Sequence, residues 1–170
     1  MKRPVQLAAL LLCTLFTASL LAQATAASRP AGVPKDWILF TAKNAFSFWG
    51  PPDMKEQKVQ GEDSYEGKYV SPTMEVRFDY GMYSGEYSGD KAKVEEITLD
   101  DRKATLATWD GGVELHVANV AKPGTLDANG KPRAGVKLSI GVTCKAADAP
   151  QATLLLRSLT FGTSTTRGGN

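Results

Sequence analysis

The sequence predicts an α+β domain, with a mainly antiparallel β-sheet of about six to seven strands and a C-terminal helix packed on it. The clearest observation is the alternation of apolar and charged residues from Met74 to Tyr80, which is typical of strands that bury one face. Several more short segments alternate in the same way, and turn residues separate them. A single segment near the C-terminus combines helix-start residues with a run of three leucines.

The N-terminal segment has the three parts of a secretory signal peptide. Lys2 and Arg3 precede an apolar run from Val5 to Leu21, and the small residues Ala24-Thr25-Ala26 follow it. The run is shorter than the ~20 apolar residues of a membrane-spanning helix, and polar residues interrupt it, so a signal peptide is favoured over a membrane anchor. We expect cleavage after Ala26, with Ala24 as the alternative, and a periplasmic or secreted protein. The expected organisation is a signal peptide (1–26), a flexible lead-in (27–35), one α+β domain (36–161) and a disordered tail (162–170).

Cleavage changes the charge and cysteine arguments. The chain has 20 Lys+Arg and 18 Asp+Glu, and the leader holds two bases and no acid, so 18 of each remain. Without a basic excess, nucleic acid is not an expected partner, and we expect no membrane insertion after cleavage. Cys13 leaves with the leader and Cys144 remains alone. The exported chain therefore has no internal disulfide, and hydrophobic burial must hold the fold.

The first half of the expected domain begins with apolar clusters. Asp36 to Phe40 forms a short strand or a turn that plugs the core, and Phe46 to Phe48 alternates before Gly50-Pro51-Pro52 stops it. Residues 53–62 are polar and form either a connecting strand or a loop. Tyr65 to Val70 and Met74 to Tyr80 form a hairpin around Ser71-Pro72-Thr73, where proline fixes φ.

The second half continues with the following elements. A second hairpin joins Val94–Leu99 to Arg102–Trp109 through Asp100-Asp101, because aspartate tolerates turn geometry. Val113 to Val120 and Val136 to Cys144 are further strands, and the second of these places Cys144 on the core face. In the helix that follows, Asp148 is the expected cap, Pro150 suits the first turn, and Gln151 stands three residues after the cap. Its body covers 152–158, and Leu159 to Phe161 returns to the sheet.

This order of elements resembles the PsbP-like fold. The similarity lies in the aromatic start (Trp37, Phe46, Phe48), Pro51-Pro52, the hairpins, the last long strand and the closing segment ATLLLRSLTF. It spans roughly Asp36 to Phe161 and consists of apolar spacings. The resemblance implies an antiparallel sheet with packed helices and a role in binding other proteins. The chain departs from the family because it has one clear helix where the fold usually has more. No functional residue can be carried over from the family, since fold does not imply function.

His116 is the only histidine and lies on the polar face of its strand. A Ser-His-Asp triad would use it as base, but no nucleophile elbow accompanies it. Cys144 with His116 as base is a second option, which the apolar setting of Cys144 opposes. One histidine and one cysteine fall short of a zinc site.

Asp127 to Gly130 resembles a calcium-loop fragment but is better explained as a hairpin tip. Glycosidases use two carboxylates, and Glu95-Glu96 and Asp100-Asp101 each supply two. Neighbouring residues of a strand face opposite ways, however, and those at a turn are solvated, so we do not expect either pair to be catalytic.

The segment from Gly81 to Gly89 is the best candidate for function. Tyrosine, serine and glycine are frequent in binding loops, because tyrosine brings rigid contact area and small neighbours let it adapt. The alternative is that these tyrosines fold back as a lid over the sheet. The predicted partner-binding residues are Met82, Tyr83 and Tyr87 as contact area, with Glu86 and Asp90 as polar rim.

We therefore expect an exported, non-catalytic domain that binds a protein partner in the periplasm, as an immunity or accessory protein. We expect no cofactor, metal site or catalytic residue. One alternative is a small-molecule or lipid carrier with an apolar cavity between sheet and helix. The other is a small hydrolase that uses His116 with a carboxylate or Cys144.

Overall fold

A computed structural model of the chain describes residues 28–43, 45–61, 63–85, 91–121, 124 and 135–162. The predicted signal peptide and C-terminal tail lie outside these residues, apart from Gly162. Among the described residues, no helix has the length and apolar character needed to cross a bilayer.

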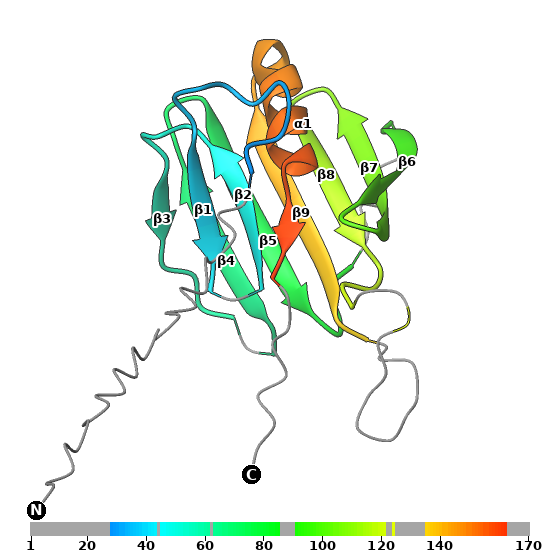
Figure 1. Cartoon of the computed structure of the whole chain (residues 1–170). Helices are drawn as coiled ribbons and strands as arrows, with labels where there is room; N and C mark the ends of the chain where they lie inside the picture. Colours follow the sequence, from blue (N-terminus) through cyan, green and yellow to red (C-terminus); the bar gives the residue numbers. More distant parts are fainter. Residues whose placement is uncertain are drawn as a thin grey trace, which may run out of the picture.

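A seven-stranded antiparallel sheet forms the back layer of the molecule (Figure 1). Each neighbouring pair in this sheet is antiparallel. The last strand of this sheet along the chain, β9, lies at its centre between β5 and β8, so the middle of the sheet joins residues far apart in the sequence. Its strands, in spatial order, are β3 (Lys55–Gln57), β4 (Tyr65–Val70), β5 (Met74–Gly81), β9 (Lys137–Cys144), β8 (Gly112–Val117), β7 (Arg102–Trp109) and β6 (Lys93–Leu99).

A second, three-stranded antiparallel sheet packs in front of the first. It consists of β1 (Ile38–Ala42), β2 (Phe46–Gly50) and β10 (Thr160–Phe161), with β2 in the middle. Aromatic side chains fill the space between the two sheets. The rings of Phe46 and Phe78 meet edge-to-face with their centres 5.0 Å apart, and those of Phe48 and Tyr69 meet in the same way with their centres 5.3 Å apart. These contacts fix β2 over β4 and β5.

One α-helix, α1 (Ala149–Arg157), covers the rest of the same face over β8 and β9 (Figure 1). Ala152, Leu155 and Leu156 of the helix are buried. Asp148 stands at the predicted cap position, but its side chain makes no capping hydrogen bond. The expected cap chemistry is therefore wrong, because the 3₁₀ turn η1 (Ala146–Asp148) gives Asp148 helical dihedrals, whereas a capping residue is extended.

The two faces of the large sheet differ in composition. The inner face, against the small sheet and α1, carries the buried apolar residues, for example Val76 and Phe78 on β5 and Leu138, Ile140 and Val142 on β9. The outer face carries the alternate, polar positions of the same strands. This alternation confirms that the predicted hairpins bury one face.

The α+β class and the antiparallel pairing are confirmed, but the predicted strand number is wrong. The structure has ten strands in two sheets among its described residues, instead of about six to seven in one. The first two aromatic segments and Thr160–Phe161 form the separate small sheet, and the polar Lys55–Gln57 adds an edge strand to the large one. Apolar alternation marks buried faces but does not say which sheet a strand joins.

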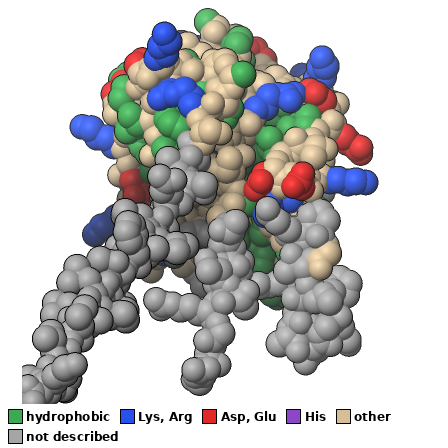
Figure 2. Space-filling model, in the orientation of Figure 1, with side chains coloured by type: hydrophobic (Ala, Val, Ile, Leu, Met, Phe, Trp, Pro, Cys, Tyr) green, Lys and Arg blue, Asp and Glu red, His purple; other side chains and the backbone are tan. Residues whose placement is uncertain are grey.

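The surface mixes both signs of charge. Figure 2 shows lysine and arginine side chains interspersed with aspartate and glutamate on the face that carries the small sheet and α1.

Candidate functional site

One row of directly opposed residues runs across the outer face of the large sheet. The register of six strands places polar side chains at every position of this row. The row consists of Glu66, Asp79, Ser139, His116, Thr105 and Glu96.

The connection from β5 to β6 begins beside this row. The two strands run in the same direction, and β9, β8 and β7 separate them in the sheet. The described start of the connection lies on the polar outer face, where Ser139 of β9 donates a hydrogen bond to the carbonyl of Gly85.

At the start of this connection, Ser84 and Gly85 are held by hydrogen bonds. The two residues between β5 and Ser84 are exposed. Ser84 is only 1% exposed, and its hydroxyl donates to the carbonyl of Asp79 at 3.0 Å. Directly before it, Met82 is 62% and Tyr83 79% exposed. We call these two side chains the Met82–Tyr83 surface.

The other predicted contact residues behave differently or lie elsewhere. Glu86, Tyr87 and Asp90 fall outside the described residues. Tyr80 is half-buried, and its ring lies 6.3 Å from that of Phe46, so it packs toward the core as the alternation predicts. The structure therefore places two of the five predicted contact residues, and both are among its most exposed large apolar side chains.

His116 meets Ser139 on the outer face. Nδ1 of the imidazole lies 3.1 Å from the Ser139 hydroxyl oxygen. That hydroxyl has a single proton, which goes to the Gly85 carbonyl, a group that can only accept. Ser139 therefore accepts from His116. A general base must instead accept the proton of its nucleophile, so this pair lacks the arrangement of a serine hydrolase.

Asp79, the carboxylate next to Ser139 in the row, also stands in the wrong place for a triad. Asp79 is the cross-strand partner of Ser139, not of His116. A triad aspartate would bond the imidazole nitrogen that faces away from the serine. In the described part of the chain, Oδ1 of Asp79 is buried and has no hydrogen-bond partner.

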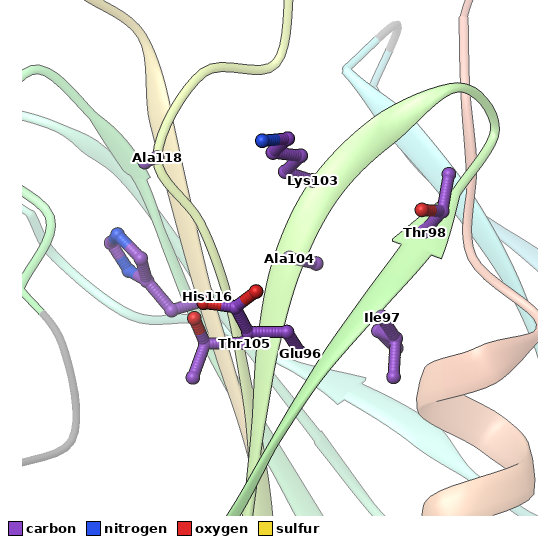
Figure 3. A pocket seen from close by; sticks show the side chains of 8 residues that line it. All are labelled: Glu96, Ile97, Thr98, Lys103, Ala104, Thr105, His116 and Ala118. Carbon is purple, nitrogen blue, oxygen red and sulfur yellow. The ribbon is translucent and has the colours of Figure 1, made fainter.

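A polar hollow of about 330 Å³ lies on the outer face over β6, β7 and β8. Figure 3 shows His116 at one side of it, with the imidazole pointing away from Ile97 and Thr98 on β6. The cavity expected for a lipid carrier was apolar and between sheet and helix, whereas this hollow is polar and lies on the opposite face. Its lining residues are Glu96, Ile97, Thr98, Lys103, Ala104, Thr105, His116 and Ala118.

Cys144 and His116 are far apart. Cys144 pairs with Met74 at the other end of β9, five residues from Ser139, which corresponds to about 17 Å along a strand. The two side chains also point to opposite faces of the sheet. Burial, and to a lesser extent Asp148, raise the pKa of the Cys144 thiol. Cys144 is thus an inert packing residue, as its alternation predicts.

The adjacent carboxylates are separated or used structurally. Glu95 bonds Arg157 of α1 at 2.9 Å, while Glu96 belongs to the outer-face row. Asp100 and Asp101 have φ values of 46° and 66° and form the predicted turn. No three histidine, cysteine or acidic side chains gather into a metal site among the described residues. The calcium-like segment 127–130 falls outside them.

Comparison of the chain with protein-family models, curated proteins and solved structures finds no match.

The sequence analysis missed Ser139 and Ser84. Both are polar residues at ordinary positions, one on the wet face of a strand and one in a glycine- and serine-rich loop. The wet-face alternation of 136–144 and 113–117 indicates that Ser139 and His116 point outward, but only the register of β8 against β9 makes them partners.

Proposed function

We propose that the chain is an exported, non-catalytic domain that binds a protein partner through the Met82–Tyr83 surface. The observation that carries this proposal is the contrast between two large, exposed side chains and the anchored residues that directly follow them. Tyrosine and methionine are enriched at protein interfaces, and tyrosine is frequent among the few residues that carry most of the binding energy. The anchors at Ser84 and Gly85 reduce the ordering that binding must impose on this segment.

Two further observations support the non-catalytic part. The proton arrangement makes His116 a donor to Ser139, and Asp79 stands on the wrong side of the pair for a triad. The resemblance to the PsbP-like fold supports the same conclusion, because many proteins of that fold act by binding. The predicted signal peptide supports a periplasmic location, and the small size of the domain is compatible with the role of an immunity or accessory protein.

The test is site-specific crosslinking in the compartment of the exported protein. A photoreactive phenylalanine analogue at position 83 should crosslink to one protein partner. The same analogue at position 94 is the matched control, since Val94 is also 61% exposed but lies on the edge strand β6.

Binding is then measured with the captured partner. The double variant Met82→Ala/Tyr83→Ala should lower affinity by at least about tenfold, because truncation of a central interface residue typically costs more than 1 kcal/mol. Val94→Ala should leave affinity unchanged. Equal capture from positions 83 and 94, or full affinity of the double variant, contradicts the proposal.

A further inference from the structure

We infer that His116 and Ser139 are positioning residues that hold the Met82–Tyr83 surface, through a hydrogen-bond chain in which Nδ1 of His116 carries the proton. We call His116, Ser139 and the Gly85 carbonyl the Ser139 bridge. Its role in recognition rests on the proposed function, whereas its protonation and its effect on the segment do not.

The direction of the bridge follows from the donors and acceptors present. A carbonyl oxygen accepts hydrogen bonds and a serine hydroxyl donates only one. Ser139 spends its proton on Gly85, so the 3.1 Å contact with His116 needs a proton on Nδ1. The neutral imidazole is therefore the Nδ1–H tautomer.

Burial protects the His116 end of the bridge from water, whereas the bond between Ser139 and Gly85 is exposed. His116 is 5% exposed, although Leu115 and Val117 on either side of it already occupy the inner face. Its imidazole is therefore buried on the outer face, where water cannot easily replace its hydrogen-bond partners in the protein. A hydrogen bond in such a site is stronger than one at an open surface.

The bridge acts together with Ser84 to restrain the segment. Ser84 ties the chain to β5, its own strand, and Gly85 is tied to β9, which is 54 residues away in the sequence. The exposed side chains of Met82 and Tyr83 thus project from a backbone fixed to two neighbouring strands. We conclude that loss of the hydrogen bond from Ser139 to Gly85 removes one of these two restraints and leaves the core side chains in place.

The tautomer is measured first, on the unmodified exported protein. Because the sequence contains one histidine, two- and three-bond ¹H–¹⁵N correlation spectra of the imidazole give a single pattern. We expect the Nδ1–H pattern at a pH where the ring is neutral. An Nε2–H pattern overturns the inference without any variant.

Positioning is measured by ¹⁵N relaxation of residues 82–85. Order parameters should be near the ~0.85 of rigid backbone in the unmodified protein and fall below about 0.6 in Ser139→Ala. Ser139→Thr keeps the hydroxyl and should retain the rigid values. Thr143→Ala is the matched control, since Thr143 is an exposed hydroxyl residue on the same face of β9.

Each outcome separates the two proposals. Unchanged order parameters in Ser139→Ala overturn the positioning role even if the Met82–Tyr83 surface binds a partner. Loss of order in Ser139→Ala supports positioning even if the crosslinking experiment at position 83 fails. If Ser139→Ala does not fold, His116→Asn, which retains a side-chain donor, must keep residues 82–85 ordered, and His116→Leu must not.

Discussion

The buried guanidinium of Arg102 and the partly exposed carboxylate of Asp100 form an ion pair that joins the two sheets. Nη1 of Arg102 lies 2.7 Å from Oδ2 of Asp100, and the same oxygen accepts a 3.2 Å hydrogen bond from the backbone amide of Phe161. Arg102 is 4% exposed, donates from Nε to the Val120 carbonyl at 2.6 Å, and places its guanidinium 4.4 Å from the centre of the Phe161 ring. One side chain thus links the β6–β7 turn, the end of β8 and the C-terminal strand β10.

Replacement of Arg102 should destabilise the fold strongly. Arg102→Met keeps apolar volume but leaves the Val120 carbonyl and the Asp100 carboxylate without their donor. We expect the free energy of unfolding to fall by about 1–3 kcal/mol, because the buried Val120 carbonyl loses its charged donor, whereas water can reach the partly exposed Asp100 carboxylate. Urea unfolding measures the change. Lys103→Met, at an exposed position on the same strand, is the control and should change stability by no more than about 0.5 kcal/mol.

Gly67 provides space for an aromatic ring. Gly67 and Phe78 are cross-strand partners, and a Cβ atom on Gly67 would lie 2.1 Å from Cζ of Phe78. Gly67→Ala should lower the free energy of unfolding by about 1–3 kcal/mol, since the ring must leave its packed position against Phe46 and Tyr65.

Gly85→Ala is the matched substitution, because a Cβ there meets nothing within 4 Å. Thermal unfolding of the two variants should differ clearly. Equal transition temperatures would show that the ring of Phe78 moves aside at little cost.

Stability should depend on Glu75 in a defined pH range. Hydrogen bonds from Lys68 and then Arg77 hold the pKa of Glu75 below its ordinary value of 4.5. A depressed pKa means that the unfolded chain binds the proton first, so the contribution of Glu75 is present above pH 4.5 and is lost as the pH falls through the depressed value.

Glu75→Gln should therefore cost about 0.5 kcal/mol at neutral pH, a typical value for a half-exposed pair. The difference between variant and unmodified protein should vanish in strong acid. A stability difference that is constant from neutral to strongly acidic pH contradicts this assignment. Glu96→Gln, an exposed glutamate for which no ion pair is described, is the control.

Cys144 should react slowly in the folded protein. Its raised pKa, caused by burial and then by Asp148, lowers the thiolate fraction at a given pH. We expect its reaction with an aromatic disulfide at pH 8 to be on the order of tenfold slower than in the urea-unfolded chain. Asp148→Asn should raise the rate only slightly, because burial is the main cause of the shift. Equal rates in the folded and unfolded chain would contradict an inert thiol.

Much of the fold was predictable from local patterns. The hairpins around Ser71–Thr73 and Asp100–Asp101 appear where turn chemistry indicates them, and the helix starts next to Pro150 as expected. These features depend on neighbouring residues, whose preferences are written directly in the sequence. Lys55–Gln57 could not be assigned, because an exposed edge strand has no apolar face and its pairing with β4 decides its state.

The candidate site was only partly predictable for the same reason. Loop composition singled out Met82 and Tyr83, and the structure finds them exposed. The bond between Ser139 and His116 joins residues from strands that no local signal pairs, and the use of Asp100 as a partner of Arg102 and Phe161 has the same origin.

The amino-acid sequence was enough to predict the α+β class, the extent of most strands, the single helix and which residues of a strand share a face, since each follows from alternation and turn residues over a few positions. The three-dimensional structure was needed to show which faces are buried, that the strands divide into two sheets, that β9 enters the centre of the larger one, and that Ser139 reaches both His116 and Gly85. The physical reason is that strand order and register are selected by packing across the whole core, where contacts between distant segments compete, and no short stretch of chain contains that competition.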